Sequence, residues 1–231
     1  MQIFNIASIY KGVVNSDSFS VHDFDILTLY PLDFEEFLWA NAEFALTREI
    51  RNHFSDFSPM GKKLHEKALS QFRLYLIIGG MPAAIMEYKK KRSSCWYLTP
   101  SKSSLHLYPV DTGLCSCILK IPAFQLLSGE ETTAGTACIE TFLTQHFIRN
   151  GYALSYWSSG NQAEVPFLLS KNSHFIAIDY RSTPHQKCRN LMQLNKSSLS
   201  PAPTQMYLIS AEDFRQKEAY QIVPLYAVFC I

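Results

Sequence analysis

The sequence lacks an excess of charge of either sign. Its 231 residues contain 21 Lys and Arg against 20 Asp and Glu, which gives a formal net charge of +1. Because no strong overall field results, binding to nucleic acid or to an acidic membrane would have to depend on a local patch of the surface.

Long apolar runs and targeting signals are also missing. No uninterrupted apolar stretch approaches the roughly 20 residues that are needed to cross a bilayer. Met1 to Tyr10 contain no basic region followed by an apolar core, as a secretory signal would. We therefore expect a cytoplasmic location and no membrane partner.

The six cysteines lack the paired spacing of a zinc site and the density of a disulfide scaffold. Cys115 and Cys117 stand one residue apart, but no second pair or nearby His accompanies them, so we expect reduced thiols. The seven His residues show no His-x-x-x-His or His-Glu-x-x-His spacing, and no Gly-x-Ser-x-Gly motif occurs. These absences argue against a metallohydrolase or a serine hydrolase.

What the sequence does contain is typical of a folded protein with a well-filled interior. Hydrophobic residues make up 47% of the chain and aromatic residues 13%, which favours a packed core over disorder. The length fits one or two domains.

The first third of the chain is predicted to be mainly helical. Phe24 to Leu32 read as a short strand that Pro31 ends. Asp33, with Glu36 three residues later, fits a capping box, and the helix that it begins is expected to extend to about Phe54.

Two more helices are expected before the middle of the chain. Ser58-Pro59 precedes a run with apolar residues at steps of four, which Gly79-Gly80 should end, and Pro82 should begin the next helix. The segment from Lys89 to Ser104 then passes from a basic run into Ser, Thr and Pro, and we interpret it as a linker. The basic run could contact phosphates, or it could be a solvated helix end whose cations oppose the negative end of the dipole.

Beyond this segment the pattern predicts an α/β or α+β domain. A strand is expected at 105–110 and an amphipathic helix around 139–147 that Gly151 can close. The remaining elements are expected to be strands at 153–157, 164–169 and 175–180, a helix around 186–194, and strands at 205–210 and 221–229.

Two stretches are more specific than these patterns. Ser18 to Ala40 (SFSVHDFDILTLYPLDFEEFLWA) and Tyr75 to Tyr88 (YLIIGGMPAAIMEY) closely resemble the middle of a large group of bacterial and archaeal AAA-type ATPases. The resemblance implies that residues 1–90 are an ATPase-derived strand and helical lid-like segment, and that 91–104 are a linker.

The second half resembles the domain of unknown function that ends those ATPases. The matching strings are DTGL at Asp111 to Leu114, IETFLTQHF around Glu140, YWSSGNQAEVPF at Tyr156 to Phe167, and VPLYAVF near the end. The resemblance implies that residues 105–231 form a mixed-sheet domain similar to the PD-(D/E)xK nuclease fold.

Two parts of the ATPase pattern are missing. A phosphate-binding loop, Gly-x-x-x-x-Gly-Lys-[Ser/Thr], should begin the ATPase module, yet the only Gly-Lys pair is Gly61-Lys62, with no glycine-rich loop before it. The long segment that the family normally inserts near residues 91–104 is also absent. We therefore expect no nucleotide cofactor, and the chain resembles a remnant of a longer ATPase.

The nuclease resemblance assigns a catalytic set of residues, which would gather Mg²⁺ or Mn²⁺ if the site kept its function. Glu140 matches the helix glutamate, and Glu164 matches the Glu of the family's Ala-Glu-Val-Asp-Phe string. The metal-binding Asp of that string is Pro166 here. Asp179 and Arg181 stand where the family has Glu and Lys. Glu140 and Asp179 are the remaining candidate metal ligands, and Arg181 could stabilise charge but could not relay a proton.

Each of these residues also has an ordinary structural interpretation. Glu140 and Glu164 could be exposed carboxylates, and Asp179 and Arg181 a surface ion pair worth well under ~1 kcal/mol. We therefore expect a non-catalytic remnant that contacts a protein or DNA. The alternatives are a weak metal-dependent nuclease that uses all four residues, and a subunit that docks on an intact ATPase.

Overall fold

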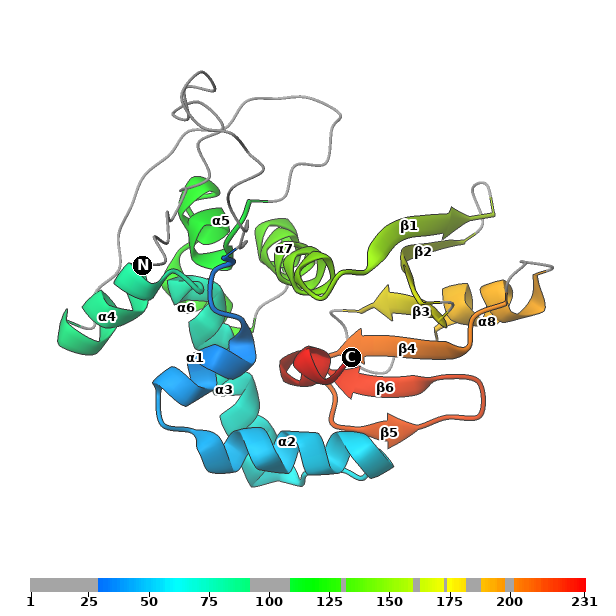
Figure 1. The fold of residues 1–231 in the computed structure, drawn as a ribbon, viewed down its shortest axis with the longest axis horizontal. Helices are drawn as coiled ribbons and strands as arrows, with labels where there is room; N and C mark the ends of the chain where they lie inside the picture. The colour runs from blue at the N-terminus through cyan, green and yellow to red at the C-terminus, as the bar shows by residue number, and fades with distance from the viewer. Residues whose placement is uncertain are drawn as a thin grey trace, which may run out of the picture. The chain divides into compact units, whose positions relative to one another are not determined.

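The computed structural model describes residues 29–91, 109–129, 132–159, 163–172, 174–181, 188–197 and 202–231. The chain divides into two compact units, residues 1–30 and 31–231. The helices and strands of the second unit are drawn in Figure 1. The strand predicted at 24–32 lies mostly outside the described residues, and residues 29–32 do not form a strand.

The second unit begins with helices. They are α1 (Phe34–Ala40), α2 (Phe44–Asp56), α3 (Lys62–Ile78), α4 (Pro82–Lys91), α5 (Thr112–Ile118), α6 (Ala123–Ser128) and α7 (Thr133–Arg149). The predicted capping box is present, because the Asp33 carboxylate accepts from the Glu36 amide at 2.9 Å and Glu36 Oε2 accepts from the Asp33 amide at 3.0 Å.

The single helix that we expected from Asp33 to Phe54 is instead divided into α1 and α2. Asn41 caps the end of α1, and Ala42 has a φ of 62°, in the left-handed region that a helix cannot contain. The prediction of one helix was wrong because the break contains no Gly or Pro that would mark it in the sequence. The later boundaries at Gly79 and Pro82 are confirmed.

After α7 the chain forms a sheet. Its strands are β1 (Ala153–Ser158), β2 (Glu164–Lys171), β3 (His174–Tyr180), β4 (Gln205–Ser210), β5 (Arg215–Gln216) and β6 (Gln221–Pro224), with α8 (Arg189–Lys196) between β3 and β4. The strand order is β1-β2-β3-β4-β6-β5. The pairs β3–β4 and β4–β6 are parallel and the others antiparallel, so the sheet is mixed and the predicted α+β class is confirmed.

The last predicted strand, 221–229, is only half correct. β6 ends at Pro224, and residues Leu225–Cys230 form the 3-10 helix η2. Proline cannot donate a ladder hydrogen bond, so the pairing with β4 stops at the Ser210–Pro224 pair. Of the strand predicted at 105–110, only residues 109 and 110 are described, and neither is in a strand.

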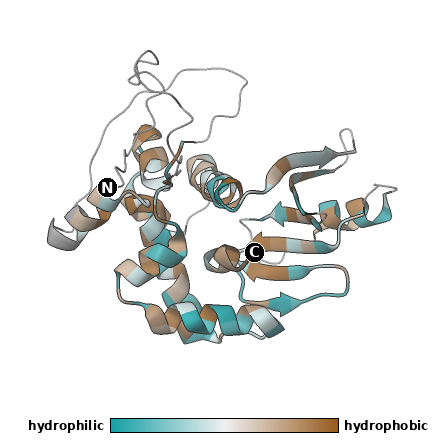
Figure 2. Cartoon of the chain, in the orientation of Figure 1, coloured by the Kyte–Doolittle hydropathy of each residue, from teal (hydrophilic) through white to brown (hydrophobic). Residues whose placement is uncertain are grey.

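Two hydrophobic clusters cover the two faces of the sheet. On one face, the N-cap residue Cys188 and Leu191 and Leu194 of α8 pack against apolar residues of β2, β3, β4 and β6. On the other face, α7 and η2 join the remaining strand residues to the helices at the start of the unit. In Figure 2 the hydrophobic colour is concentrated in β4, β6 and η2, whereas β5 is hydrophilic.

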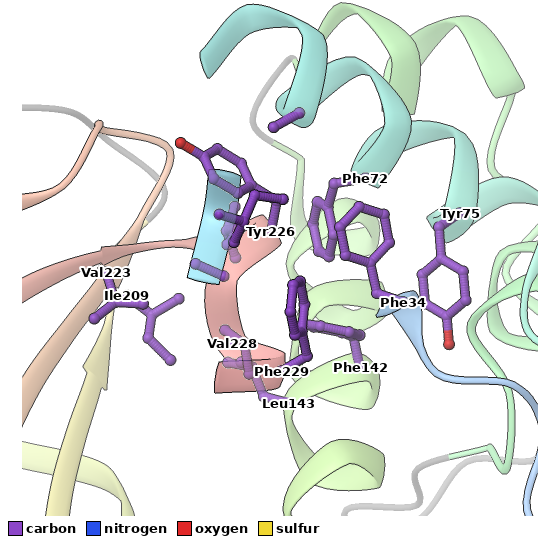
Figure 3. Packing of buried hydrophobic residues seen from close by; sticks show 14 of the residues in the cluster. Phe34, Phe72, Tyr75, Phe142, Leu143, Ile209, Val223, Tyr226, Val228 and Phe229 are labelled. Atoms are coloured by element: carbon purple, nitrogen blue, oxygen red, sulfur yellow. The ribbon is translucent and has the colours of Figure 1, made fainter. Parts of the chain in front are cut away.

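The larger cluster connects the early helices to the sheet through aromatic rings (Figure 3). Phe34 of α1 lies 5.4 Å from Phe72 of α3 and 6.2 Å from Phe229 of η2, between ring centroids, and Phe72 lies 4.9 Å from Phe142 of α7. These contacts show that the residues on either side of the predicted linker share one core. Fully burying one such ring contributes roughly 1.5–3 kcal/mol.

Candidate functional site

Asp179 is a predicted catalytic residue whose side chain is held in place by contacts from several directions. It lies near the end of β3 and is 2% exposed. Its Oδ2 atom is 3.1 Å from Arg181 Nη2 and accepts from the Cys188 thiol at 3.4 Å. Burial raises the pKa of Asp179, while Arg181 and Cys188 act in the opposite direction.

The interpretation of Asp179 and Arg181 as a surface ion pair is therefore wrong for its acidic member. Side chains alternate between the two faces of a strand, and Ala177 and Asp179 both face the cluster around α8. A buried carboxylate needs a partner to offset its lost hydration, and Arg181 supplies that partner from two residues further along the chain.

Pro166 stands at an irregularity of β2. Trp157 pairs with Val165 and Ser155 with Leu168, so β2 has one more residue than β1 across this step. The ladder between β2 and β3 begins only at Phe167. This is a β-bulge, where a residue without an amide proton is tolerated.

Glu164, and the helix that carries Glu140, lie on the face of the sheet opposite to the Asp179 side chain. Val165 belongs to the cluster around α8, so its exposed neighbour Glu164 faces the other side of the sheet. Glu140 is on α7, which packs on that other side through Phe142. Within the described ranges, no group of three or more His, Cys, Asp or Glu could hold a metal ion. The catalytic roles and the nuclease-like assignment remain predictions.

A small cavity lies on the α7 side of the sheet, beside the carboxyl end of β3. Its volume is about 70 Å³, and Thr136, Ile139, Tyr180 and Ala211 are among the residues that line it. None of the predicted catalytic residues lines this cavity, so it does not connect Glu140 to Asp179.

A second set of contacts joins the DTGL string of the second half to the two strings that resemble AAA-type ATPases. The Asp111 carboxylate, 4% exposed, accepts from the amides of Gly80 at 2.5 Å and Leu114 at 3.0 Å. Gly80 in turn accepts from the Leu32 amide at 2.8 Å. Burial raises the pKa of Asp111, and these backbone donors oppose the rise. Strings that are far apart in sequence thus meet at one carboxylate.

The glycines in these strings allow the backbones to approach closely. A Cβ atom on Gly80 would lie 2.0 Å from the Leu32 carbonyl oxygen, and one on Gly113 would lie 2.4 Å from the Ile78 carbonyl oxygen. Both distances are far below a van der Waals contact. The glycines are therefore required by packing, and their presence in the motif does not by itself indicate ligand binding.

Arg149 at the end of α7 connects this helix to the start of α1. Its Nη1 atom donates to the Pro31 carbonyl at 2.9 Å and lies 3.5 Å from Asp33 Oδ2. Its Nη2 atom lies 2.9 Å from Glu36 Oε2. The guanidinium therefore binds both carboxylates of the capping box that starts α1.

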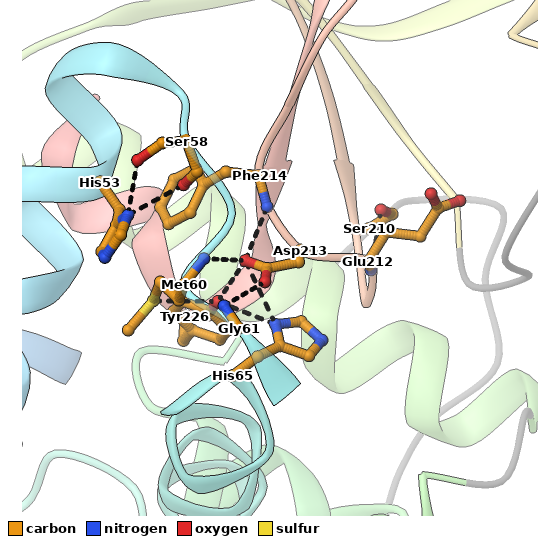
Figure 4. Close-up of polar contacts among 10 residues, drawn as sticks. All are labelled: His53, Ser58, Met60, Gly61, His65, Ser210, Glu212, Asp213, Phe214 and Tyr226. Atoms are coloured by element: carbon orange, nitrogen blue, oxygen red, sulfur yellow. Dashed lines mark hydrogen bonds and ion pairs between the residues drawn. The ribbon is translucent and has the colours of Figure 1, made fainter. Parts of the chain in front are cut away.

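Another junction involves Asp213 in the loop after β4 (Figure 4). Its carboxylate accepts from the amides of Met60 and Gly61, both at 3.1 Å, and from the Tyr226 hydroxyl at 3.5 Å. His65 Nδ1 lies 2.9 Å from Tyr226 Oη and 3.8 Å from Asp213 Oδ1. Burial and the nearby carboxylate raise the pKa of Tyr226. The group holds the start of α3 against the sheet.

Sequence reasoning missed the structural importance of Asp111 and Asp213. The DTGL string gave a signal for Asp111, since an Asp before a helix is a preferred cap, and Asp111 does cap α5. No local pattern marks Asp213, because its partners Met60 and Gly61 lie about 150 residues earlier in the chain.

Comparison with known proteins places part of the chain. Residues 136–228, from α7 into η2, match a family described as Domain of unknown function (DUF4143). No curated protein and no solved structure matches the chain. The expectation that the second half contains such a domain is confirmed for these residues. In the part of the chain that the structure describes, no helix has both the length and the apolar character needed to span a bilayer.

Proposed function

We propose that the chain is a non-catalytic remnant of an AAA-type ATPase, in which a helical lid-like segment is joined to a degenerate nuclease-like domain that contacts a protein or DNA. The observation that carries the proposal is the state of Asp179. Its carboxylate is 2% exposed and is already bonded to Arg181 and Cys188. A metal ligand needs an oxygen free to replace water on the cation, and Arg181 and Cys188 both compete with a cation for Oδ2.

Two further observations support the loss of chemistry. Pro166 offers no side-chain oxygen where the resembled family has an Asp. The helix α7, which carries Glu140, packs on the face of the sheet opposite to the Asp179 side chain. The sequence also has no glycine-rich loop that could hold a triphosphate. The shared aromatic core and the Asp213 junction support a contacting role, because they fix the helical segment and the domain as one body.

A second candidate is a subunit that docks on an intact ATPase. Trp39 and Phe44, on either side of the break between α1 and α2, are 46% and 61% exposed. Large exposed rings close together are typical of docking sites. If the neighbouring gene encodes a phosphate-binding loop, co-purification with its product tests this candidate.

Isothermal titration of the purified protein tests the leading proposal. With ATP and Mg²⁺, and separately with Mn²⁺, we expect no saturable binding in the micromolar range, because the required ligands do not converge. An Asp179→Asn variant serves as the matched control for Mn²⁺. Micromolar Mn²⁺ binding that this variant loses would support the weak-nuclease alternative, in which Glu140, Glu164, Asp179 and Arg181 act together.

A further inference from the structure

We infer that the outer edge of β1 is a self-association surface, on which two copies of the chain pair their β1 strands antiparallel about a two-fold axis and continue the sheet from one copy into the other. The inference does not depend on the proposed ATPase ancestry.

The sheet has two edges, and they differ in character. β1 ends the strand order on one side and β5 on the other, as Figure 1 shows. An edge strand presents unpaired amides and carbonyls that can pair with another chain, and proteins usually protect such edges with short strands, charges or proline.

The β5 edge is protected in this way. It is two residues long, Arg215 and Gln216, both exposed, and Arg215 Nη1 lies 3.7 Å from Glu212 Oε2. Figure 2 shows β5 as hydrophilic. A short charged strand offers few backbone groups to a partner and carries like charges against a second copy of itself.

The β1 edge lacks these protections. Its six residues, ALSYWS, include no Asp, Glu, Lys, Arg or Pro. β2 pairs along one side of the strand, and no residue in the described ranges pairs along the other. The bulge at Pro166 belongs to β2, so β1 itself keeps a regular alternation and a usable ladder.

Symmetry favours a second copy of this chain as the partner. A two-fold axis perpendicular to the sheet makes each face of the sheet continuous from one copy to the other. A residue that points to one face therefore pairs with a residue of the other copy that points to the same face, so both residue numbers are even or both are odd. In the two centred registers, Tyr156 therefore faces either Tyr156 or Leu154 of the other copy. Any charge in the strand would face a like charge, directly or diagonally, and the strand has none.

Tyr156 is the residue that such pairing would cover. Its side chain is 69% exposed, although it lies on the same strand face as Leu154, which packs against the larger core. Aromatic pairs across neighbouring strands stabilise a sheet. Antiparallel pairing would bury the ring without moving any residue of the described core.

Sedimentation equilibrium over a range of concentrations tests the inference. We expect the natural chain to dimerise, and Tyr156→Lys and Tyr156→Glu each to weaken dimerisation at least about tenfold through like-charge contact. An equimolar mixture of the two variants should restore the dimer. Gln216→Lys, on the opposite edge, is the matched control and should dimerise like the natural chain.

A natural chain that stays monomeric at about 100 μM would overturn the inference, because a dimer with a micromolar Kd would be mostly assembled at that concentration. So would dimers that survive in both Tyr156 variants, or a mixture that stays monomeric. Hydrogen exchange on the natural chain gives a second test that needs no variant. Amides within 153–158 should exchange more slowly at high protein concentration, and exchange independent of concentration would contradict the pairing.

Discussion

Arg181 and Asp179 form a 3.1 Å ion pair, in which Asp179 is 2% exposed. Burial raises the pKa of Asp179, and the Arg181 guanidinium is the largest of the influences that lower it. The pair uses the two residues that the nuclease resemblance assigns to catalysis. It therefore gives these residues a structural function that can be measured separately from any chemistry.

Replacing Arg181 with Ala should destabilise the fold by roughly 2–4 kcal/mol at neutral pH, because it leaves a buried carboxylate without its cation. The double variant Asp179→Asn, Arg181→Gln removes both charges and should recover most of that loss. Urea unfolding of the natural chain and the variants gives the comparison. If Arg181→Ala is neutral, the pair does not stabilise the buried carboxylate.

Gly80→Ala should be strongly destabilising, by about 3 kcal/mol or more, because the added methyl would overlap the Leu32 carbonyl oxygen and separate the segment before α1 from α3. Gly61→Ala is the matched control. Gly61 has open space around it, but its φ of 78° and ψ of 153° lie in a region that almost only glycine adopts, so about 1–3 kcal/mol of backbone strain is expected without any steric overlap. Equal losses in the two variants would mean that the close approach at Gly80 is not required.

Acid should destabilise the protein through His146. Burial lowers the pKa of His146 from 6.5 to about 4, so the unfolded chain binds the proton more readily than the folded chain between these values. The neutral ring's contribution is fully present above the unfolded pKa and is lost as the pH falls toward 4. The loss at pH 4.5 should be about 2.5 kcal/mol.

The matched variant for this prediction is His146→Gln, which cannot titrate. Unfolding in urea at pH 7 and pH 4.5 should show a smaller pH dependence for the variant than for the natural chain. The buried carboxylates Asp33, Asp111 and Asp179 have raised pKa values, and their effect has the opposite sign. Because they are present in both proteins, the difference isolates His146. Identical pH profiles would refute the prediction.

Asp213→Asn should loosen the start of α3, because an amide cannot accept from Met60 and Gly61 at both of its polar atoms. A cost of about 1.5–3 kcal/mol is expected for the lost hydrogen bond to a charged acceptor. Tyr226→Phe keeps the ring and removes one weaker contact, so it should cost less. Hydrogen exchange at the Met60 and Gly61 amides is the measurement, and unchanged protection in Asp213→Asn would count against the junction.

Local sequence signals predicted much of this fold. Alternation and turn residues located β1 to β4, and the Asp33 capping box and Pro82 located the starts of α1 and α4. These features depend on neighbouring residues, so they can be recognised from the sequence. The break at Ala42 could not be recognised in this way, because no residue propensity predicts a left-handed Ala. The break depends instead on how α1 and α2 pack.

The candidate site was less predictable than the fold. Resemblance assigned Asp179 and Arg181 to the same motif, and their pairing follows from their spacing of two residues. Which face of the sheet each carboxylate occupies depends on register, and the bulge at Pro166 shifts that register by one residue. The burial of Asp179 depends on Cys188 and α8, which come later in the chain and leave no mark around residue 179.

Cleavage of plasmid DNA in the presence of Mn²⁺ tests the central claim most directly. The natural chain should cleave no faster than a Glu140→Ala variant prepared in the same way, because Asp179 is bonded internally and lies across the sheet from α7. Cleavage by the natural chain that disappears in Glu140→Ala would contradict the account and establish an active metal-dependent nuclease.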